Sequence, residues 1–199
     1  MTAQSDRRTP RGFDFTSAMR RLCADMVRRL PQLHHIDLAR VAVSFCQARR
    51  DVAHGLQATL TPLRFEGGAA TTRQGSQRWA CQRVVDVSSG REYLYVLSFY
   101  LPRFLNLSVE EKLSTTLHEL WHISPACDGD LRRHEGRCYA HGNSQREYDA
   151  HMDRLAREWL SLDPPYHLYE FLESSYDQLA AEHGGVYGQH IPVPKLLPL

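Results

Sequence analysis

Two histidines and a glutamate in the segment 117–122 have the residue types and the spacing that bind and use a metal ion. His118 and His122 are four positions apart, so on a helix both imidazoles leave one face, a single turn from each other. Glu119 stands beside the first histidine, where its carboxylate can reach a metal-bound water without being a ligand itself. This HExxH pattern predicts a zinc site with a general base, which is the chemistry of metal-assisted hydrolysis.

The residues around the motif predict an amphipathic helix that positions it. Ser108 and Glu111 have the spacing of a capping box, in which the serine caps the helix and the glutamate returns a hydrogen bond. Apolar residues then repeat at helical spacing and form one stripe: Val109, Leu113, Leu117 and Leu120. Pro125 ends the helix soon after His122. We therefore expect the motif near the C-terminal end of a short helix that is backed by a core.

Zinc in a catalytic site takes three protein ligands and keeps one position for water, so the two histidines need a further ligand. We expect this ligand to be His141. Gly142 beside it gives the backbone freedom, and Ser144 with Glu147 forms a second capping box that begins a new helix. A histidine just before that helix can point back across the zinc helix.

Other residues compete for the third position. His134 is the first alternative and His151, within the second helix, is the next. Asp128 occupies the place of the last ligand in the longer pattern HExxHxxGxxH, but Pro125 stands where that pattern needs a glycine with positive φ. The segment 128–130 is more typical of a turn, from which either acid could orient a histidine ring.

The residues before the zinc helix predict one helix followed by a β-rich section. Apolar residues from Phe13 to Leu30 recur at helical spacing with arginines opposite, and Pro31 ends this helix. Alternating patterns predict strands at 38–47, 56–65, 79–87 and 92–99, and we interpret the glycine-containing segment 66–77 as a loop. The last strand is expected to be buried on both faces, with Tyr93, Tyr95, Leu97 and Phe99 on one and Leu94, Val96 and Ser98 on the other.

The predicted fold class is α+β, in a small zincin-like single domain. It would contain a mostly antiparallel twisted sheet, an N-terminal helix, the HExxH helix packed on the sheet and two C-terminal helices. We assign 1–12 to a flexible arm, 13–190 to the metallopeptidase domain and 191–199 to an extended C-terminal tail. The tail is expected to lie along the domain surface or in a partner, and a self-inhibitory position in the active-site cleft is an alternative.

Composition limits the classes of partner. The net charge of +1 argues against strong attraction to nucleic acid, and the dispersed arginine pairs, Arg132-Arg133 among them, are expected on solvated surfaces. No apolar run is long enough to cross a bilayer. The five cysteines are odd in number and widely spread, which fits a reducing cytoplasm, where we expect the protein to be located. Cys127 and Cys138 could bind a metal or form a disulfide with each other, although isolated cysteines are more often buried small residues.

The segment from His118 to His122, followed by the stretches 128–134 and 139–142, resembles the HExxH metallopeptidases of phages and prokaryotes. More distantly it is similar to the SprT-like zinc peptidases, in which a later His-Gly opens a further helix. That resemblance implies His141 as the third zinc ligand and peptide-bond cleavage as the activity. In some relatives the cleaved proteins are bound to DNA. This chain lacks an obvious zinc ribbon and a basic tail, so the resemblance implies the zinc site more strongly than the DNA-linked role.

The sequence therefore predicts a zinc-dependent peptidase that acts on a protein or peptide substrate. Zn²⁺ would be held by His118, His122 and His141, with Glu119 as the general base. The oxyanion could be stabilised by Tyr139, Tyr148, His134 or Arg133. We favour Tyr148, one turn into the helix after His141. Two alternatives stay open: a zinc-containing binding or adaptor domain without turnover, and a DNA-associated SprT-like protease.

Overall fold

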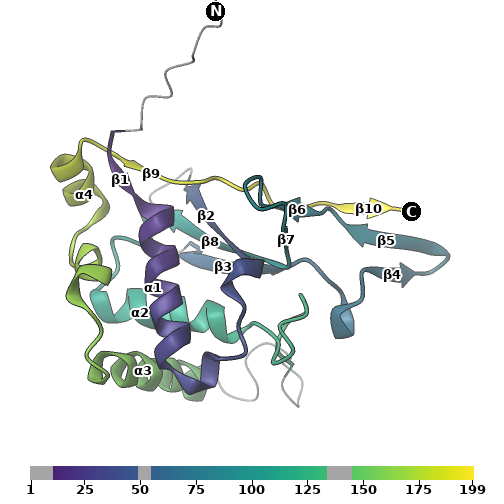
Figure 1. Cartoon of the computed structure of the whole chain (residues 1–199), viewed down its shortest axis with the longest axis horizontal. Helices are drawn as coiled ribbons and strands as arrows, with labels where there is room; N and C mark the ends of the chain where they lie inside the picture. The colour runs from purple at the N-terminus through teal and green to yellow at the C-terminus, as the bar shows by residue number, and fades with distance from the viewer. Residues whose placement is uncertain (1–10, 49–54, 134–144) are drawn as a thin grey trace, which may run out of the picture.

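The computed structural model describes residues 11–48, 55–133 and 145–199, and it confirms an α+β class (Figure 1). The predicted flexible arm 1–12 lies mostly outside this range. Longer helices are formed by α1 (Phe15–Arg29), α2 (Val109–Trp121), α3 (Gln145–Ser161) and α4 (Tyr176–His183). Strands are formed by β1 (Phe13–Asp14), β2 (Val41–Gln47), β3 (Ala58–Pro62), β4 (Thr71–Gln74), β5 (Gln77–Cys81), β6 (Val84–Val85), β7 (Glu92–Tyr93), β8 (Tyr95–Leu101), β9 (Val186–Tyr187) and β10 (Leu196–Pro198).

A three-stranded sheet, in the order β2-β8-β3, forms the centre of the molecule. The middle strand β8 is parallel to β2 and antiparallel to β3. The sheet beneath α2 is therefore mixed, and the expectation of a mostly antiparallel meander is wrong for it. The parallel pair arises because the chain leaves β2, completes β3 and the later hairpins, and only then returns to lie between β2 and β3.

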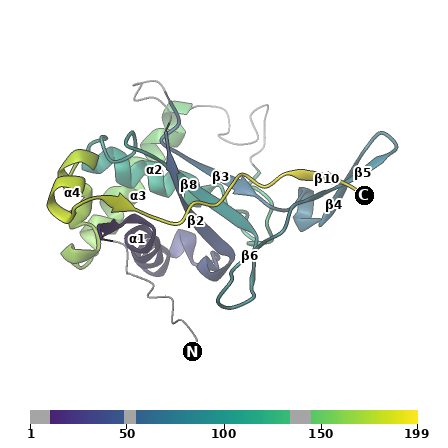
Figure 2. The same cartoon turned by 90° about the horizontal axis from the view of Figure 1, so that it is seen from above.

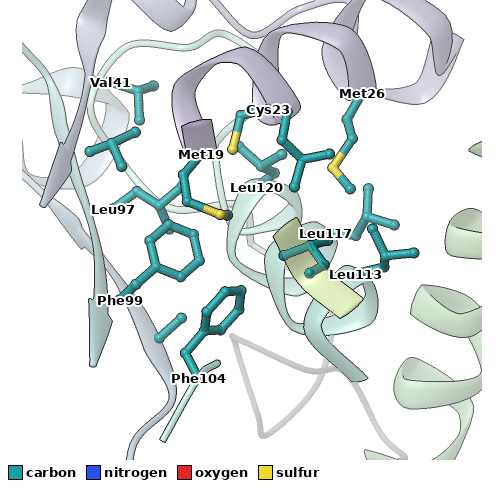
Figure 3. Close-up of a cluster of buried hydrophobic side chains, with 14 of the residues drawn as sticks. Met19, Cys23, Met26, Val41, Leu97, Phe99, Phe104, Leu113, Leu117 and Leu120 are labelled. Carbon is teal, nitrogen blue, oxygen red and sulfur yellow. The ribbon is translucent and has the colours of Figure 1, made fainter. Parts of the chain in front are cut away.

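One face of this sheet is covered by α1 and α2, which share the main core (Figure 3). Met19, Cys23 and Met26 of α1 meet Leu113, Leu117 and Leu120 of α2 over the ring of Phe99 and the side chain of Leu97. These are the apolar stripes that the sequence predicts. Their complete burial explains why both helices form where they do, because most helical stability in proteins comes from packing an apolar face.

The ends of these two helices also follow their sequence signals. Asp14 caps α1 by accepting from the backbone N–H of Ser17 at 3.0 Å, and α1 ends just before Leu30 and Pro31. In α2 the capping box is complete: the Ser108 hydroxyl accepts from the Glu111 N–H, and the Glu111 carboxylate accepts from the Ser108 N–H.

The second of the two predicted C-terminal helices is present as shorter pieces. Two 3₁₀ turns, Tyr166–Leu168 and Glu170–Glu173, precede α4, which ends at Gly184 with the left-handed φ of 76° that glycine tolerates. Helix α3 is tied to α1 by a hydrogen bond of 3.1 Å from Trp159 Nε1 to the buried Asp25 carboxylate.

The opposite face of the sheet carries a smaller cluster made of Ala42, Leu63, Tyr93, Val96 and Ile191. The two-sided burial expected for the strand at 92–99 is therefore confirmed. The assignment of faces needs one correction, because Tyr93 packs with Val96 while Leu94 joins the main core. The strand is interrupted at Leu94, between β7 and β8. Because of this break, Tyr93 and Leu94 lie on the faces opposite to those that unbroken alternation predicts.

The segment 66–77, which we expected to be a loop, contains strand β4. It pairs with β5 in a hairpin whose two-residue turn is Gly75-Ser76, with Gly75 at φ 61°. Together with β10 this hairpin makes a separate three-stranded sheet, which projects away from the helices (Figures 1 and 2). A single meander would place β5 in the central sheet. In the structure β5 belongs to this separate sheet instead.

The C-terminal segment runs along the domain surface, which is the first of the positions expected for it (Figure 2). Gln189 accepts from the Phe45 N–H at 2.7 Å and Ile191 donates to the Ser44 hydroxyl at 2.9 Å, so the segment follows the β2 edge of the central sheet. Its last residues pair with β5 as β10. The tail thus lies along the edge opposite β3. In the part of the chain that the structure describes, no helix is long and apolar enough to cross a membrane.

Candidate metal centre

The two motif histidines lie side by side at the C-terminal end of α2. His122 is the residue at which the helix ends, and its imidazole centroid is 4.7 Å from that of His118. The rings are nearly perpendicular, with 77° between their planes, and both are only partly buried. This is the placement predicted from their spacing, because residues four apart stack on one face of a helix.

Tyr148 of α3 packs against both imidazoles. Its ring centroid is 4.8 Å from that of His118, edge to face, and 6.0 Å from that of His122, nearly parallel. The phenol donates a hydrogen bond of 3.5 Å to the backbone carbonyl of His118. Burial raises the pKa of Tyr148, and the negative charge of Glu119 adds to this effect. The structure therefore brings Tyr148 to the pair as a neutral donor.

Glu119, next to His118 on α2, lies toward strand β3. The residue is 8% exposed, and its carboxylate accepts a hydrogen bond from the backbone of Leu60. Burial raises the pKa of the Glu119 carboxyl to about 7, while the hydrogen bond from Leu60 opposes this rise. Since α2 packs on β3, the glutamate lies between this helix and the edge of the sheet.

Strand β3 is an edge strand whose outward backbone groups can be identified. The Gln57 carbonyl accepts from the Tyr100 N–H at 2.8 Å, so the backbone N–H and C=O groups of the odd-numbered residues of β3 are directed toward β8. Ala58 and Leu60 pair with Phe99 and Leu97 in the alternate positions, with their backbone groups directed away from the sheet. The Glu119 carboxylate accepts the hydrogen bond of the Leu60 N–H, which is one of these outward-directed groups. Within the described residues no further strand pairs with this edge.

The turn after α2 is held by the buried Tyr95 of β8. Its hydroxyl donates to the Asp130 carbonyl and accepts from the Gly129 N–H, both at 2.9 Å. Gly129 has a φ of 95°, which favours glycine, so the turn predicted at 128–130 is confirmed. Asp128 is used within this turn, where it accepts from Ser124 Oγ at 2.6 Å.

Arg132 closes this turn onto the end of α2, a role that the sequence analysis missed. Its side-chain Nε donates to the Trp121 carbonyl and its backbone N–H donates to the His122 carbonyl, both at 2.7 Å. The guanidinium lies 4.2 Å from the centroid of the Trp121 ring and is hydrogen-bonded to His35 at 3.2 Å. Arg132 is therefore half-buried, and the expectation that the Arg132-Arg133 pair is solvated holds only for the exposed Arg133.

The proposed third ligand, His141, lies outside the residues that the structure describes. His134 also lies outside them, as do Cys138 and the cap residue Ser144, so neither histidine is placed relative to the pair. His151 packs edge to face on Trp121, with 4.7 Å between ring centroids. Across 11–48, 55–133 and 145–199, no three His, Cys, Asp or Glu side chains gather closely enough to hold a metal ion. Asp128, His151 and Cys127 thus do not join His118 and His122.

The described part of the site still fits a zinc ion. Two nitrogen ligands of a tetrahedral zinc, each about 2.0–2.1 Å from the metal, are about 3.3 Å apart. Rings with centroids at 4.7 Å can present nitrogens at this separation, and imidazole is a ligand that zinc prefers. The fit covers two ligands, and His141 from beyond the described residues would be the third.

A cavity of about 820 Å³ opens beside the pair, between α2, α3 and the start of β3. His118 and Glu119 lie at one end of its wall. A substrate could therefore approach both the imidazole and the carboxylate from the same side.

The chain was compared with family models, with curated proteins and with solved structures. No family model matches the chain, and neither curated proteins nor solved structures give a match. The resemblance to the SprT-like peptidases stays a prediction from the motif residues, and the function has to be argued from the site.

Proposed function

We propose that the protein is a zinc-dependent peptidase. The observation that carries this proposal is the pairing of His118 with His122 on one face of α2, while Glu119 of the same turn lies toward an edge strand. Two imidazoles able to bind a metal, a carboxylate beside them and a strand edge with which no described strand pairs are parts that metal-assisted peptide hydrolysis can use.

His118 and His122 would hold the ion through one ring nitrogen each, with His141 as the proposed third ligand. A bound Zn²⁺ would lower the pKa of a water molecule and polarise the scissile carbonyl. Tyr148 supports the two imidazoles, because its ring packs against both of them and restricts their orientation.

Glu119 is the proposed general base. Its carboxylate takes a proton from the attacking water and later gives it to the leaving amine. The hydrogen bond from the Leu60 backbone holds this carboxylate toward the cavity that also contains His118. The Tyr148 phenol is the proposed donor to the oxyanion, which would require it to turn away from the His118 carbonyl.

Strand β3 would align the substrate. An extended peptide can add to an exposed strand edge through main-chain hydrogen bonds. The backbone N–H and C=O of Ala58 and the C=O of Leu60 are directed to that edge, next to Glu119. A peptide in this register would pass the carboxylate with its scissile bond near the histidine pair.

Hydrolysis by the wild type and by Glu119→Gln, each supplied with zinc, tests the proposal. With denatured casein as substrate, we expect Glu119→Gln to keep its metal and to lose activity by about 10²–10⁴-fold, the usual contribution of a general base. Glu182→Gln on the exposed side of α4 is the matched control and should be fully active. Zinc binding without hydrolysis of any substrate by the wild type would instead favour a binding or adaptor domain.

A further inference from the structure

The cavity beside His118 and Glu119 continues as a groove between α2 and α3. The two helices run antiparallel, since Tyr148 near the start of α3 contacts His118 near the end of α2, and Asp153 accepts from Ser114 one turn further along. The groove therefore leads from the histidine pair toward the first turn of α2. Its mouth is bounded by the residues that enter β3, Leu56 to Ala58.

The floor of the groove is apolar. It is formed by side chains from α2, α3 and the segment before α2: Leu107, Leu113, Met152, Ala156 and Leu160. Leu113, Met152 and Ala156 are buried, so the floor belongs to the packed α2–α3 contact and is preformed. Such a floor accommodates an aliphatic chain, because burying its methylene groups is favourable by about 0.8 kcal/mol each.

The rim of the groove is acidic. Among the described residues that line it, the rim carries Glu110, Glu111, Asp149 and Asp153 and one arginine, Arg157. Within the described residues Glu110, Glu111 and Asp153 form no ion pair. Asp153 accepts from the Ser114 hydroxyl at 2.7 Å, a contact that satisfies one oxygen and leaves the negative charge in place.

We propose that this groove binds a lysine or arginine side chain of the substrate, next to the bond that is cleaved. The inference rests on the proposed function and adds the class of substrate. A basic side chain matches both parts of the groove, because its methylene stem can lie on the apolar floor while its cationic head reaches the acidic rim. The acidic rim would repel an acidic side chain. A purely aliphatic side chain would contact the apolar floor but would have no charge to pair with the rim.

The test uses the full chain carrying Glu119→Gln, so that binding is measured without turnover. The probes are fluorescein-labelled alanine-rich peptides that differ at one central position: lysine, arginine, norleucine or glutamate. Norleucine keeps the aliphatic stem of lysine and lacks its charge. In fluorescence anisotropy we expect lysine and arginine peptides to bind about 5–10-fold more tightly than the norleucine peptide, and the glutamate peptide to bind most weakly.

A second substitution locates the effect. Adding Asp153→Asn keeps an acceptor for Ser114 and removes the charge, so the preference for lysine over norleucine should fall about 2–5-fold. Asp177→Asn, an exposed aspartate in the first turn of α4, is the matched control and should leave the preference unchanged. Equal binding of lysine and norleucine peptides, or an equal effect of Asp153→Asn and Asp177→Asn, would overturn the inference.

Parallel cleavage of the same peptides by the wild-type protein separates the two proposals. Cleavage without a preference for basic residues contradicts the groove assignment and leaves the peptidase in place. A binding preference with no cleavage of any peptide supports the groove and contradicts the peptidase.

Discussion

The phenol ring of Tyr148 lies edge to face on the imidazole of His118, with 4.8 Å between their centroids, although the two residues come from different helices. The hydroxyl donates to the His118 carbonyl, so the tyrosine both orients the ring and binds the end of α2. The ring contact and the hydroxyl can be separated by mutation.

Tyr148→Phe keeps the ring and removes the hydroxyl. If the phenol stabilises the oxyanion, kcat should fall about 10²–10³-fold while zinc content and Tm stay near those of the wild type. Steady-state kinetics with elemental analysis measures both. Tyr166→Phe, which removes an exposed phenol bonded to Glu173, is the control. Unchanged kcat in Tyr148→Phe would limit this residue to packing against the histidines.

Arg132 should stabilise the fold far more than its neighbour Arg133. Arg132→Met removes a hydrogen bond to the Trp121 carbonyl and a cation–π contact, so we expect the free energy of unfolding to fall by about 1–3 kcal/mol. Arg133 is exposed and pairs with Asp130, so Arg133→Met should cost less than about 1 kcal/mol. Urea denaturation of both variants checks the difference, and equal losses would refute the closing role of Arg132.

Lys112 should make the free energy of unfolding depend on pH in the alkaline range. The residue is 2% exposed, and burial lowers its pKa to about 8, with Nζ donating to the Leu172 and Ser174 carbonyls. Between pH 8 and the ordinary lysine pKa near 10.4, the unfolded chain holds a proton that the folded chain has lost. Stability from this group therefore rises with pH across that window, by on the order of 2–3 kcal/mol.

The measurement is the free energy of unfolding of wild type and Lys112→Met at several pH values. The free energy of unfolding of the wild type should rise relative to that of Lys112→Met as pH increases from about 8 to about 10.4. A difference that stays constant across this range would mean that Lys112 keeps an ordinary pKa in the folded protein.

Strand β3 should contribute main-chain contacts to the substrate. Ala58→Pro removes an N–H that faces away from β8, and proline is tolerated at such edge positions. We expect KM for peptides to rise about 3–10-fold, the effect of one lost hydrogen bond, with kcat and Tm little changed. A variant with the wild-type KM would show that the substrate does not pair at this position.

The sequence predicts the local features of this fold better than its long-range pairing. The helix that carries His118 and the capping box of Ser108 and Glu111 are set by residues within a few positions of each other, and both are confirmed. The parallel pairing of β2 with β8 depends on which strand the chain returns to, and alternation within a strand carries no such information.

Strand β4 and the charged residues Arg132 and Lys112 were missed for different reasons. Strand β4 is polar and lacks apolar alternation, although Gly75-Ser76 is a two-residue hairpin signal that could have found it. Arg132 and Lys112 are charged residues that the fold at least partly buries. A single sequence offers no sign of this, because Lys112 bonds the Leu172 carbonyl and Arg132 bonds His35, both distant along the chain. At the site, the pair His118 and His122 follows from helical spacing, while the third ligand stays a prediction.

Metal content tests the central proposal most directly. Elemental analysis of purified wild type supplied with zinc should give about one zinc per chain, since a catalytic site holds one ion. His118→Ala and His141→Ala should lose it, while His134→Ala and the exposed control His167→Ala should keep it. Loss with His134→Ala and retention with His141→Ala would move the third ligand to His134. A wild type that binds no zinc, or a His118→Ala variant that binds as much as the wild type, would contradict the zinc peptidase.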